Sequence, residues 1–190
     1  MISVLITDPL YYSRDPYLFG KKLRQILSFH SPTYIMIRDK QCTDLEPIIY
    51  EIHRMLKDYP QIQGAINSDG ALALKYHWHL HLPSHRLHEI SHYKKEGLCV
   101  SGSCHSWEEA KSAYEGGADW ITYSPIFASP GKGEGIGLDK LNEIAGKIKC
   151  PIVALGGIIS NDQVALVKGS LASGFASIRY FIQDGNNYEI

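Results

Sequence analysis

Two glycine-rich stretches in the second half of this sequence have the composition of a phosphate-binding site. Residues 119–137 read DWITYSPIFASPGKGEGIG and residues 150–158 read CPIVALGGI, so each joins a strand-like run to glycines. Glycines let backbone N–H groups approach an anion closely, and a helix that begins after them adds a favourable dipole. The predicted phosphate ligands are Ser129, Lys132, Gly156, Gly157 and Arg179. The alternative is that the glycines serve only tight turns.

Two cations and an amide stand at the ends of earlier strand-like runs. In IMIRDK, strand residues two apart point to the same side, so Arg38 and Lys40 share a side and could hold an anionic substrate. The alternative is an exposed basic pair. Asn67 follows another run and could hydrogen-bond a ligand.

The segment GSCHSWEEA, residues 102–110, carries the best candidate for proton transfer. Ser103 and His105 share a side at a strand end, and Ser106 with Glu109 fits a capping box, which predicts that a helix begins there. The positive end of that helix favours a neutral imidazole. We expect His105 to be a general acid or base that Ser103 orients. The alternative is a histidine packed under the helix.

Short apolar runs alternate with helical patterns along the whole chain, which predicts a single α/β domain over residues 1–190. Strands are expected at 3–7, 33–37, 62–66, 78–82, 98–102, 119–123, 152–154 and 174–178. Helices are expected at 16–28, 43–56, 70–75, 85–96, 107–115, 138–147 and 161–168. This alternation favours a compact (β/α)8 TIM barrel over a doubly wound open sheet, and no G-x-G-x-x-G follows the first strand. Since only residues 179–190 follow the last strand, the eighth helix should be short or missing.

The histidine-rich segment 77–92 begins HWHLHLPSHRLH and could be read as a metal site. His77, His79 and His81 would lie on one strand face, with His85 and His88 on the following helix. A zinc site needs three or four converging ligands, and no acidic residue or cysteine stands among these histidines. We therefore predict a polar lining of the barrel and no metal ligands.

Composition argues against several classes of partner. The 19 Lys and Arg nearly balance the 20 Asp and Glu and no strong basic patch is visible, so nucleic acid is not an expected partner. No apolar run is long enough to cross a membrane. The four cysteines form no C-x-x-C pair and the N-terminus lacks signal-peptide features, which predicts a cytoplasmic protein. A short eighth helix would leave apolar surface uncovered, so a homodimer is expected.

Taken together, these segments resemble the thiamin-phosphate synthase and thiazole tautomerase superfamily. The matching motifs, in order, are LITD, IRDK, INSD, HLHLPS, GSCHSWEEA, GADWITYSPIFASPGKGEGIGL and PIVALGGI. The resemblance implies a (β/α)8 barrel, a site for a phosphorylated thiazole at the carboxyl ends of the strands, and a role in thiamin biosynthesis. Arg38, Lys40, Asn67, Ser103 and Lys132 match the synthase branch.

The sequence departs from the synthase branch where that branch binds magnesium. The resemblance places its two metal-binding aspartates at Ser68 and Arg86. A hard cation needs carboxylate oxygens, so no cofactor is expected unless the protein is a synthase that uses magnesium. Met36 and Gly131 replace a glutamine and a threonine of that branch, which weakens the expected recognition of a diphosphate.

The tautomerase branch, which needs no metal, is therefore the preferred hypothesis. There the resemblance assigns to His105 the proton transfer that aromatises the thiazole. Arg179 stands where that branch has a phosphate-binding serine, and a guanidinium could replace it as a bidentate donor or block the site. The alternatives are an active thiamin-phosphate synthase with an unusual metal site, and a non-catalytic relative that binds a phosphorylated ligand.

Overall fold

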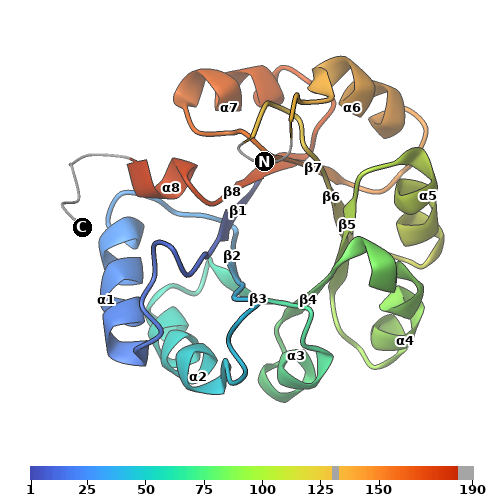
Figure 1. Cartoon of the computed structure of the whole chain (residues 1–190). Helices are drawn as coiled ribbons and strands as arrows, with labels where there is room; N and C mark the ends of the chain where they lie inside the picture. Colours follow the sequence, from blue (N-terminus) through green and yellow to red (C-terminus); the bar gives the residue numbers. More distant parts are fainter. Residues whose placement is uncertain (130–132, 184–190) are drawn as a thin grey trace.

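The computed structural model describes residues 1–129 and 133–183, and its strands close into a parallel barrel. Each strand pairs with the next in sequence and β8 pairs with β1, so the sheet has no open edge (Figure 1). The strands are β1 (Ile2–Ile6), β2 (Tyr34–Ile37), β3 (Gln63–Asn67), β4 (His79–Leu82), β5 (Val100–Cys104), β6 (Trp120–Tyr123), β7 (Ile152–Leu155) and β8 (Gly174–Ser177). The predicted (β/α)8 barrel is confirmed, and the doubly wound alternative is excluded because that sheet would be open.

Helices follow the strands around the outside of the barrel, as Figure 1 shows. They are α1 (Pro16–Leu27), α2 (Glu46–Met55), α3 (Gly70–Tyr76), α4 (Ile90–Lys95), α5 (Trp107–Glu115), α6 (Gly137–Ala145), α7 (Asn161–Lys168) and α8 (Tyr180–Gln183), with 3-10 turns η1 (Leu56–Asp58) and η2 (Ser84–Glu89). Side chains that accept the first free N–H groups fix four of the starts: Asp15, Asp69, Ser106 and Ser160. The predicted helix 85–96 is split into η2 and α4, and β5 begins two residues later than expected.

Alternate residues of each strand enter two separate cores. One set fills the barrel interior and consists of Val4, Ile6, Met36, Ala65, Trp120, Val153 and Ala176. Their strand neighbours, among them Leu5, Ile35 and Ile66, pack outward against the helices. Since side chains alternate across a strand, a strand covered on both faces needs apolar residues at nearly every position.

The described part of the eighth helix is short, as expected, and it packs beside α1 (Figure 1). Phe181 is buried and stacks on Phe175 of β8 with ring centroids 5.8 Å apart. Tyr17 and Leu18, at the start of α1, remain 70% and 50% exposed. α8 therefore covers part of the gap beside α1, and dimerisation stays a prediction.

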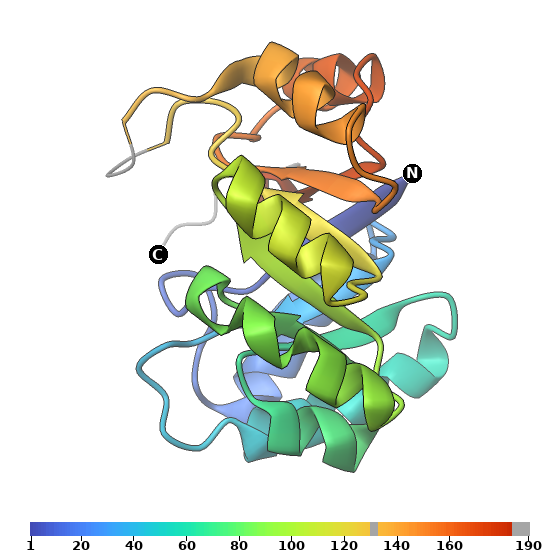
Figure 2. The same cartoon turned by 90° about the vertical axis from the view of Figure 1, so that its right-hand side faces the viewer.

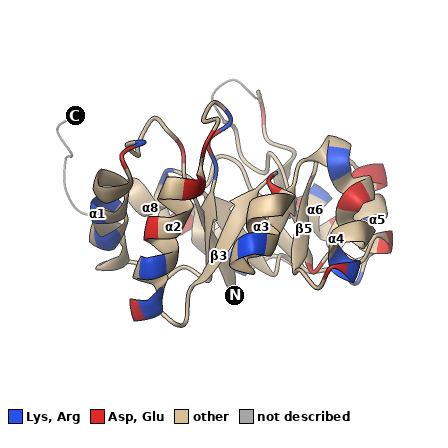
Figure 3. Cartoon of the chain, turned by 90° about the horizontal axis from the view of Figure 1, so that it is seen from below, with Lys and Arg blue, Asp and Glu red and all other residues tan. Residues whose placement is uncertain are grey.

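The outer surface carries charges of both signs. On the side drawn in Figure 3, segments of Lys and Arg and segments of Asp and Glu are both spread over the helices. Among the described helices, none has the length and apolar character needed to span a bilayer.

Replacing Gly64 in β3 should destabilise the fold, because its α-carbon lies directly against the ring of Trp78. A Cβ at this position would overlap the indole, which is buried and has the rings of His53 and Tyr76 beside it. Gly64→Ala should lower the free energy of unfolding by about 1–3 kcal/mol, measured by chemical denaturation. Gly146→Ala is the matched control, because Gly146 ends α6 with φ −71° and faces only its own helix backbone. Equal stability of the two variants would contradict this packing.

Candidate active site at the mouth of the barrel

The described candidate residues all end or follow a strand at the same side of the barrel. Because every strand is parallel, their carboxyl ends meet at one mouth, where the active sites of (β/α)8 enzymes lie. Figure 2 shows the loops after β1, β2 and β6 projecting from this side. The mouth holds Arg38, Lys40, Asn67, Ser103, His105, Ser129, Gly156, Gly157 and Arg179. Lys132 lies outside the described residues.

His105 presents an unprotonated ring nitrogen to the mouth when its ring is neutral. Its Nδ1 lies 2.9 Å from the carbonyl oxygen of Ser124 and 3.2 Å from the Ser124 hydroxyl. A carbonyl oxygen only accepts, so Nδ1 carries the hydrogen and Nε2 carries the lone pair. The side chain is exposed, and no described residue bonds Nε2. The expectation that Ser103 orients this ring is wrong, because Ser124 does so and Ser103 bonds His81 instead.

The start of α5 fixes the backbone of His105. The Ser106 hydroxyl accepts the N–H of Glu109 at 3.2 Å, as the predicted cap requires. The Glu109 carboxylate reaches one residue further back than in a capping box and accepts the N–H of His105 at 2.6 Å. Hydrogen bonds thus fix both the backbone of His105, through Glu109, and its ring, through Ser124.

The glycine pair after β7 is required by a close approach of two loops. Gly156 and Gly157 have φ of +99° and +70°, a region that favours glycine. A Cβ at Gly156 would lie 2.8 Å from Cα of Pro125, and the N–H of Phe127 donates to the Gly156 carbonyl at 3.0 Å. Turn geometry alone explains both glycines, so their role with a phosphate stays a prediction.

Two further candidates, Ser129 and Arg179, follow β6 and β8, the strands on either side of β7. Ser129 donates its N–H to the carbonyl of Gly133 at 3.4 Å, which pairs the described ends of the glycine loop. Arg179 is half-buried just after β8, and its guanidinium makes no ion pair with any described residue. Among the described residues no carboxylate competes for Arg179, which makes it a candidate for binding an anionic ligand.

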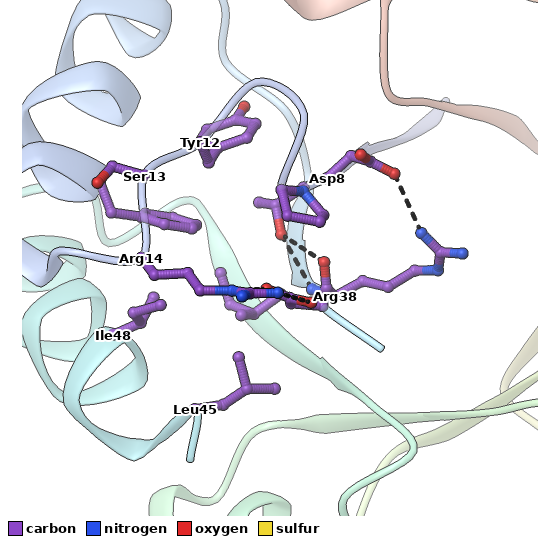
Figure 4. Close-up of a pocket in the computed structure, with 12 residues that line it drawn as sticks. Asp8, Tyr12, Ser13, Arg14, Arg38, Leu45 and Ile48 are labelled. Carbon is purple, nitrogen blue, oxygen red and sulfur yellow. Dashed lines mark hydrogen bonds and ion pairs between the residues drawn. The ribbon is translucent and has the colours of Figure 1, made fainter. Parts of the chain in front are cut away.

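Of the two predicted cations after β2, Arg38 has a carboxylate partner. Nη1 of Arg38 lies 3.3 Å from a carboxylate oxygen of Asp8, and the two side chains point toward one another in Figure 4. Arg14 binds Asp39 in a bidentate manner at 2.7 and 3.1 Å, which lowers the pKa of Asp39. Lys40 is exposed. Sequence reasoning missed the role of Asp8, although Asp8 lies only two residues after the end of β1.

The residues beside Asn67 do not fit a magnesium ion. Nη1 of Arg86 donates to the carbonyl oxygen of Ser68 at 2.6 Å, so the two positions at which the resemblance places metal-binding aspartates touch each other. Arg86 also binds both carboxylate oxygens of Glu89, and Asn67 donates to the Ser68 hydroxyl at 2.8 Å. A guanidinium thus stands where a divalent cation would need negative charge. The described residues contain no group of three acidic, histidine or cysteine side chains suited to a metal.

A chain of hydrogen bonds between histidines and serines lines the barrel interior. Nε2 of His79 lies 2.7 Å from the hydroxyl of Ser101, which lies 2.8 Å from Nδ1 of His81. Nε2 of His81 lies 2.8 Å from the hydroxyl of Ser103. Burial lowers the pKa of His79 to about 4 and that of His81 to about 3. The predicted polar lining is confirmed for these two histidines, and sequence reasoning missed Ser101.

The placement of His77 on the same strand face is wrong. His77 ends α3 in the left-handed region with φ +53°, so β4 begins only at His79. His85 and His88 lie in η2 and are exposed. The histidines of this segment therefore point to different places and do not converge.

Comparisons with known proteins give one consistent family. The profile of the family described as thiamine monophosphate synthase matches residues 4–181. A protein of Aquifex aeolicus, provisionally named thiamine-phosphate synthase 2, is 32% identical over 94% of this chain and 96% of its own. A provisionally named thiamine-phosphate synthase of Geobacter sulfurreducens is 39% identical over 46% of this chain and 42% of its own. The solved thiamine phosphate pyrophosphorylase of Pyrococcus furiosus superposes with a TM-score of 0.76 at 25% identity, covering 93% of this chain and 85% of that one.

The buried histidines should make stability fall as the pH is lowered. Their pKa values are depressed in the folded protein, so below about pH 6.5 the unfolded chain takes up protons that the folded chain refuses, and stability falls until about pH 3–4. Denaturation between pH 6.5 and 4.5 should show a shallower fall for His81→Gln than for the wild type, by up to about 1.4 kcal/mol per pH unit. His88→Gln, at an exposed histidine, should keep the wild-type slope. An unchanged slope in His81→Gln would contradict the neutral, buried state of this ring.

Proposed function

This chain belongs to the thiamine monophosphate synthase family, and we propose that it binds a thiazole phosphate at the mouth of its barrel and moves a proton on the thiazole ring without a metal ion. This reaction requires a phosphate site and a base, which different residues supply.

The phosphate is assigned to the loops after β6, β7 and β8. Ser129 and Lys132 lie on the glycine loop, Gly156 and Gly157 bring backbone close to it, and Arg179 has no competing carboxylate among the described residues. The late strands are where phosphates commonly bind in this fold. Backbone N–H groups and a guanidinium are suited to phosphate oxygens.

The proton transfer is assigned to His105. With Nδ1–H donating to Ser124, its Nε2 can accept a proton from a ring carbon of the thiazole and return it at another position. The ring starts and ends the reaction neutral, so no co-reactant is needed. Arg38 then has the role of holding an anionic group at the other side of the mouth, where a ligand must compete with Asp8.

The observation that carries the metal-free assignment is the contact between Arg86 and the Ser68 carbonyl. Magnesium at this place would face the guanidinium at close range, and the Glu89 carboxylate beside it is already bound by that guanidinium. Two like charges at such a distance repel strongly in a partly buried setting.

The second candidate is a thiamin-phosphate synthase, which the names of the relatives favour. The match over residues 4–181 and the retained Arg38, Lys40, Asn67, Ser103 and Lys132 support it. A single set of assays distinguishes the tautomerase, the synthase and a non-catalytic relative. Conversion of a non-aromatic thiazole phosphate tautomer in the presence of EDTA supports the proposal, magnesium-dependent coupling with a pyrimidine diphosphate supports the synthase, and binding without turnover supports a non-catalytic relative.

His105→Ala should lose the proton transfer and keep the ligand. We expect the turnover number to fall by about 10²- to 10⁴-fold, the usual contribution of a general acid or base, with little change in affinity for thiazole phosphate. His88→Ala removes an exposed histidine that is not among the proposed site residues and should leave turnover unchanged. Lys132→Ala should show the converse of His105→Ala, mainly weaker binding. Full turnover in His105→Ala would remove this residue from the mechanism.

Magnesium alone should not bind tightly, because Arg86 and Ser68 replace the carboxylates of the synthase branch. Isothermal titration of the protein with magnesium chloride should give no saturable heat below the millimolar range. Arg86→Asp removes the guanidinium, returns one carboxylate and should strengthen magnesium binding. A micromolar site in the wild type would contradict the metal-free proposal and favour the synthase.

A further inference from the structure

Four buried or half-buried side chains form one continuous row of hydrogen bonds inside the barrel. The row runs from His79, at the start of β4, through Ser101 and His81 to Ser103, near the carboxyl end of β5. His79, His81 and Ser101 are 4%, 3% and 0% exposed, and only Ser103 is half-buried. Ser103 is therefore the member of the row that can reach a ligand in the mouth.

Each hydrogen bond of the row fixes the direction of the next. A neutral imidazole has one N–H donor and one bare acceptor nitrogen, and a serine hydroxyl has a single hydrogen to donate. Ser101 can donate to only one of the two histidines. All three contacts are hydrogen bonds, and the Ser101 hydrogen also has an acceptor, only when all donors point the same way, either toward the mouth or away from it.

The far end of the row favours donation toward the mouth. Nδ1 of His79 is buried and has no hydrogen-bond partner among the described residues. His79 is enclosed there by the rings of Trp120, stacked at 4.9 Å, and Tyr34 at 5.2 Å. If the row donated away from the mouth, this nitrogen would carry a buried N–H without an acceptor. Such donors are rarer in proteins than acceptors without a donor.

A mixed arrangement is less favourable. If both histidines donated to Ser101, the hydroxyl hydrogen of Ser101 would have no acceptor in the row, and Ser101 is completely buried. Leaving a buried donor unsatisfied is costly, whereas the aligned row leaves only one bare nitrogen.

We propose that His79, Ser101 and His81 are positioning residues that hold Ser103 as a hydrogen-bond donor toward the bound ligand. His81 donates its Nε2–H to the Ser103 oxygen, and the Ser103 hydrogen is then directed into the mouth. The ligand atom opposite Ser103 must be an acceptor, such as a ring nitrogen or a phosphate oxygen. The ligand part of this inference rests on the proposed function, whereas the direction of the row does not.

The direction of the row can be measured without any ligand. In protein labelled with nitrogen-15 at histidine, imidazole correlation spectra at neutral pH distinguish protonated from bare ring nitrogens. His79→Gln and His81→Gln identify the two signals among the nine histidines. We expect both rings to carry hydrogen on Nε2 and none on Nδ1. A hydrogen on Nδ1 of His81 would overturn the proposal.

A pair of variants at His81 tests the effect on the ligand. His81→Gln can accept from Ser101 with its carbonyl and donate to Ser103 with its N–H, whereas His81→Leu can do neither. Titration with thiazole phosphate should show affinity close to the wild type for His81→Gln and a roughly three- to tenfold loss for His81→Leu, the size of one hydrogen bond.

The two measurements separate this inference from the proposed function. Equal affinity of both variants, whether retained or lost, would overturn the role of the row. Only glutamine can donate a hydrogen bond to Ser103, so the two variants should differ if that hydrogen bond matters for the ligand. If the wild type itself binds no thiazole phosphate, the proposed function fails, while the imidazole spectra still decide the direction of the row.

Discussion

The pairing of β8 with β1 is the interaction on which the rest of the structure depends. It closes the sheet, and a Cβ at Gly174 would overlap the backbone of Ile2, so this seam needs a glycine for the two strands to meet. Closure removes every sheet edge and brings the carboxyl ends of all strands to one mouth. Residues from eight separate segments thereby become neighbours, although no local interaction would gather them.

Closure also creates an interior that water cannot easily reach, and polar side chains placed there must satisfy one another. His79 and His81 do so through Ser101 and Ser103, and their burial keeps both rings neutral. At the mouth the same requirement pairs Arg38 with Asp8 and Arg86 with Glu89. Fewer charges are thus available to a ligand than the sequence suggests. A ligand that binds Arg38 or Arg86 must compete with the carboxylate already paired with it.

The fold was predictable from the sequence because alternation of strands and helices is a local pattern, and the rule that parallel strands end together placed the candidate residues at one mouth. The contacts within the site were not predictable in the same way. Asp8 and Arg38 are 30 residues apart, and Ser68 and Arg86 are 18 apart, so their meeting depends on how neighbouring strands and loops are aligned. The sequence prediction placed His77 in a strand, whereas His77 itself ends α3 in the left-handed region. A histidine at this position gives no sequence signal for that conformation, as a glycine would.

A crystal structure with thiazole phosphate in the presence of excess magnesium tests the central claim, a metal-free site at the mouth, most directly. The account predicts the phosphate against Ser129 and the Gly156–Gly157 turn, the thiazole ring within reach of Nε2 of His105, and Arg86 still bound to the Ser68 carbonyl. A magnesium ion held beside Asn67 with Arg86 displaced would contradict the account, as would a ligand bound away from the mouth.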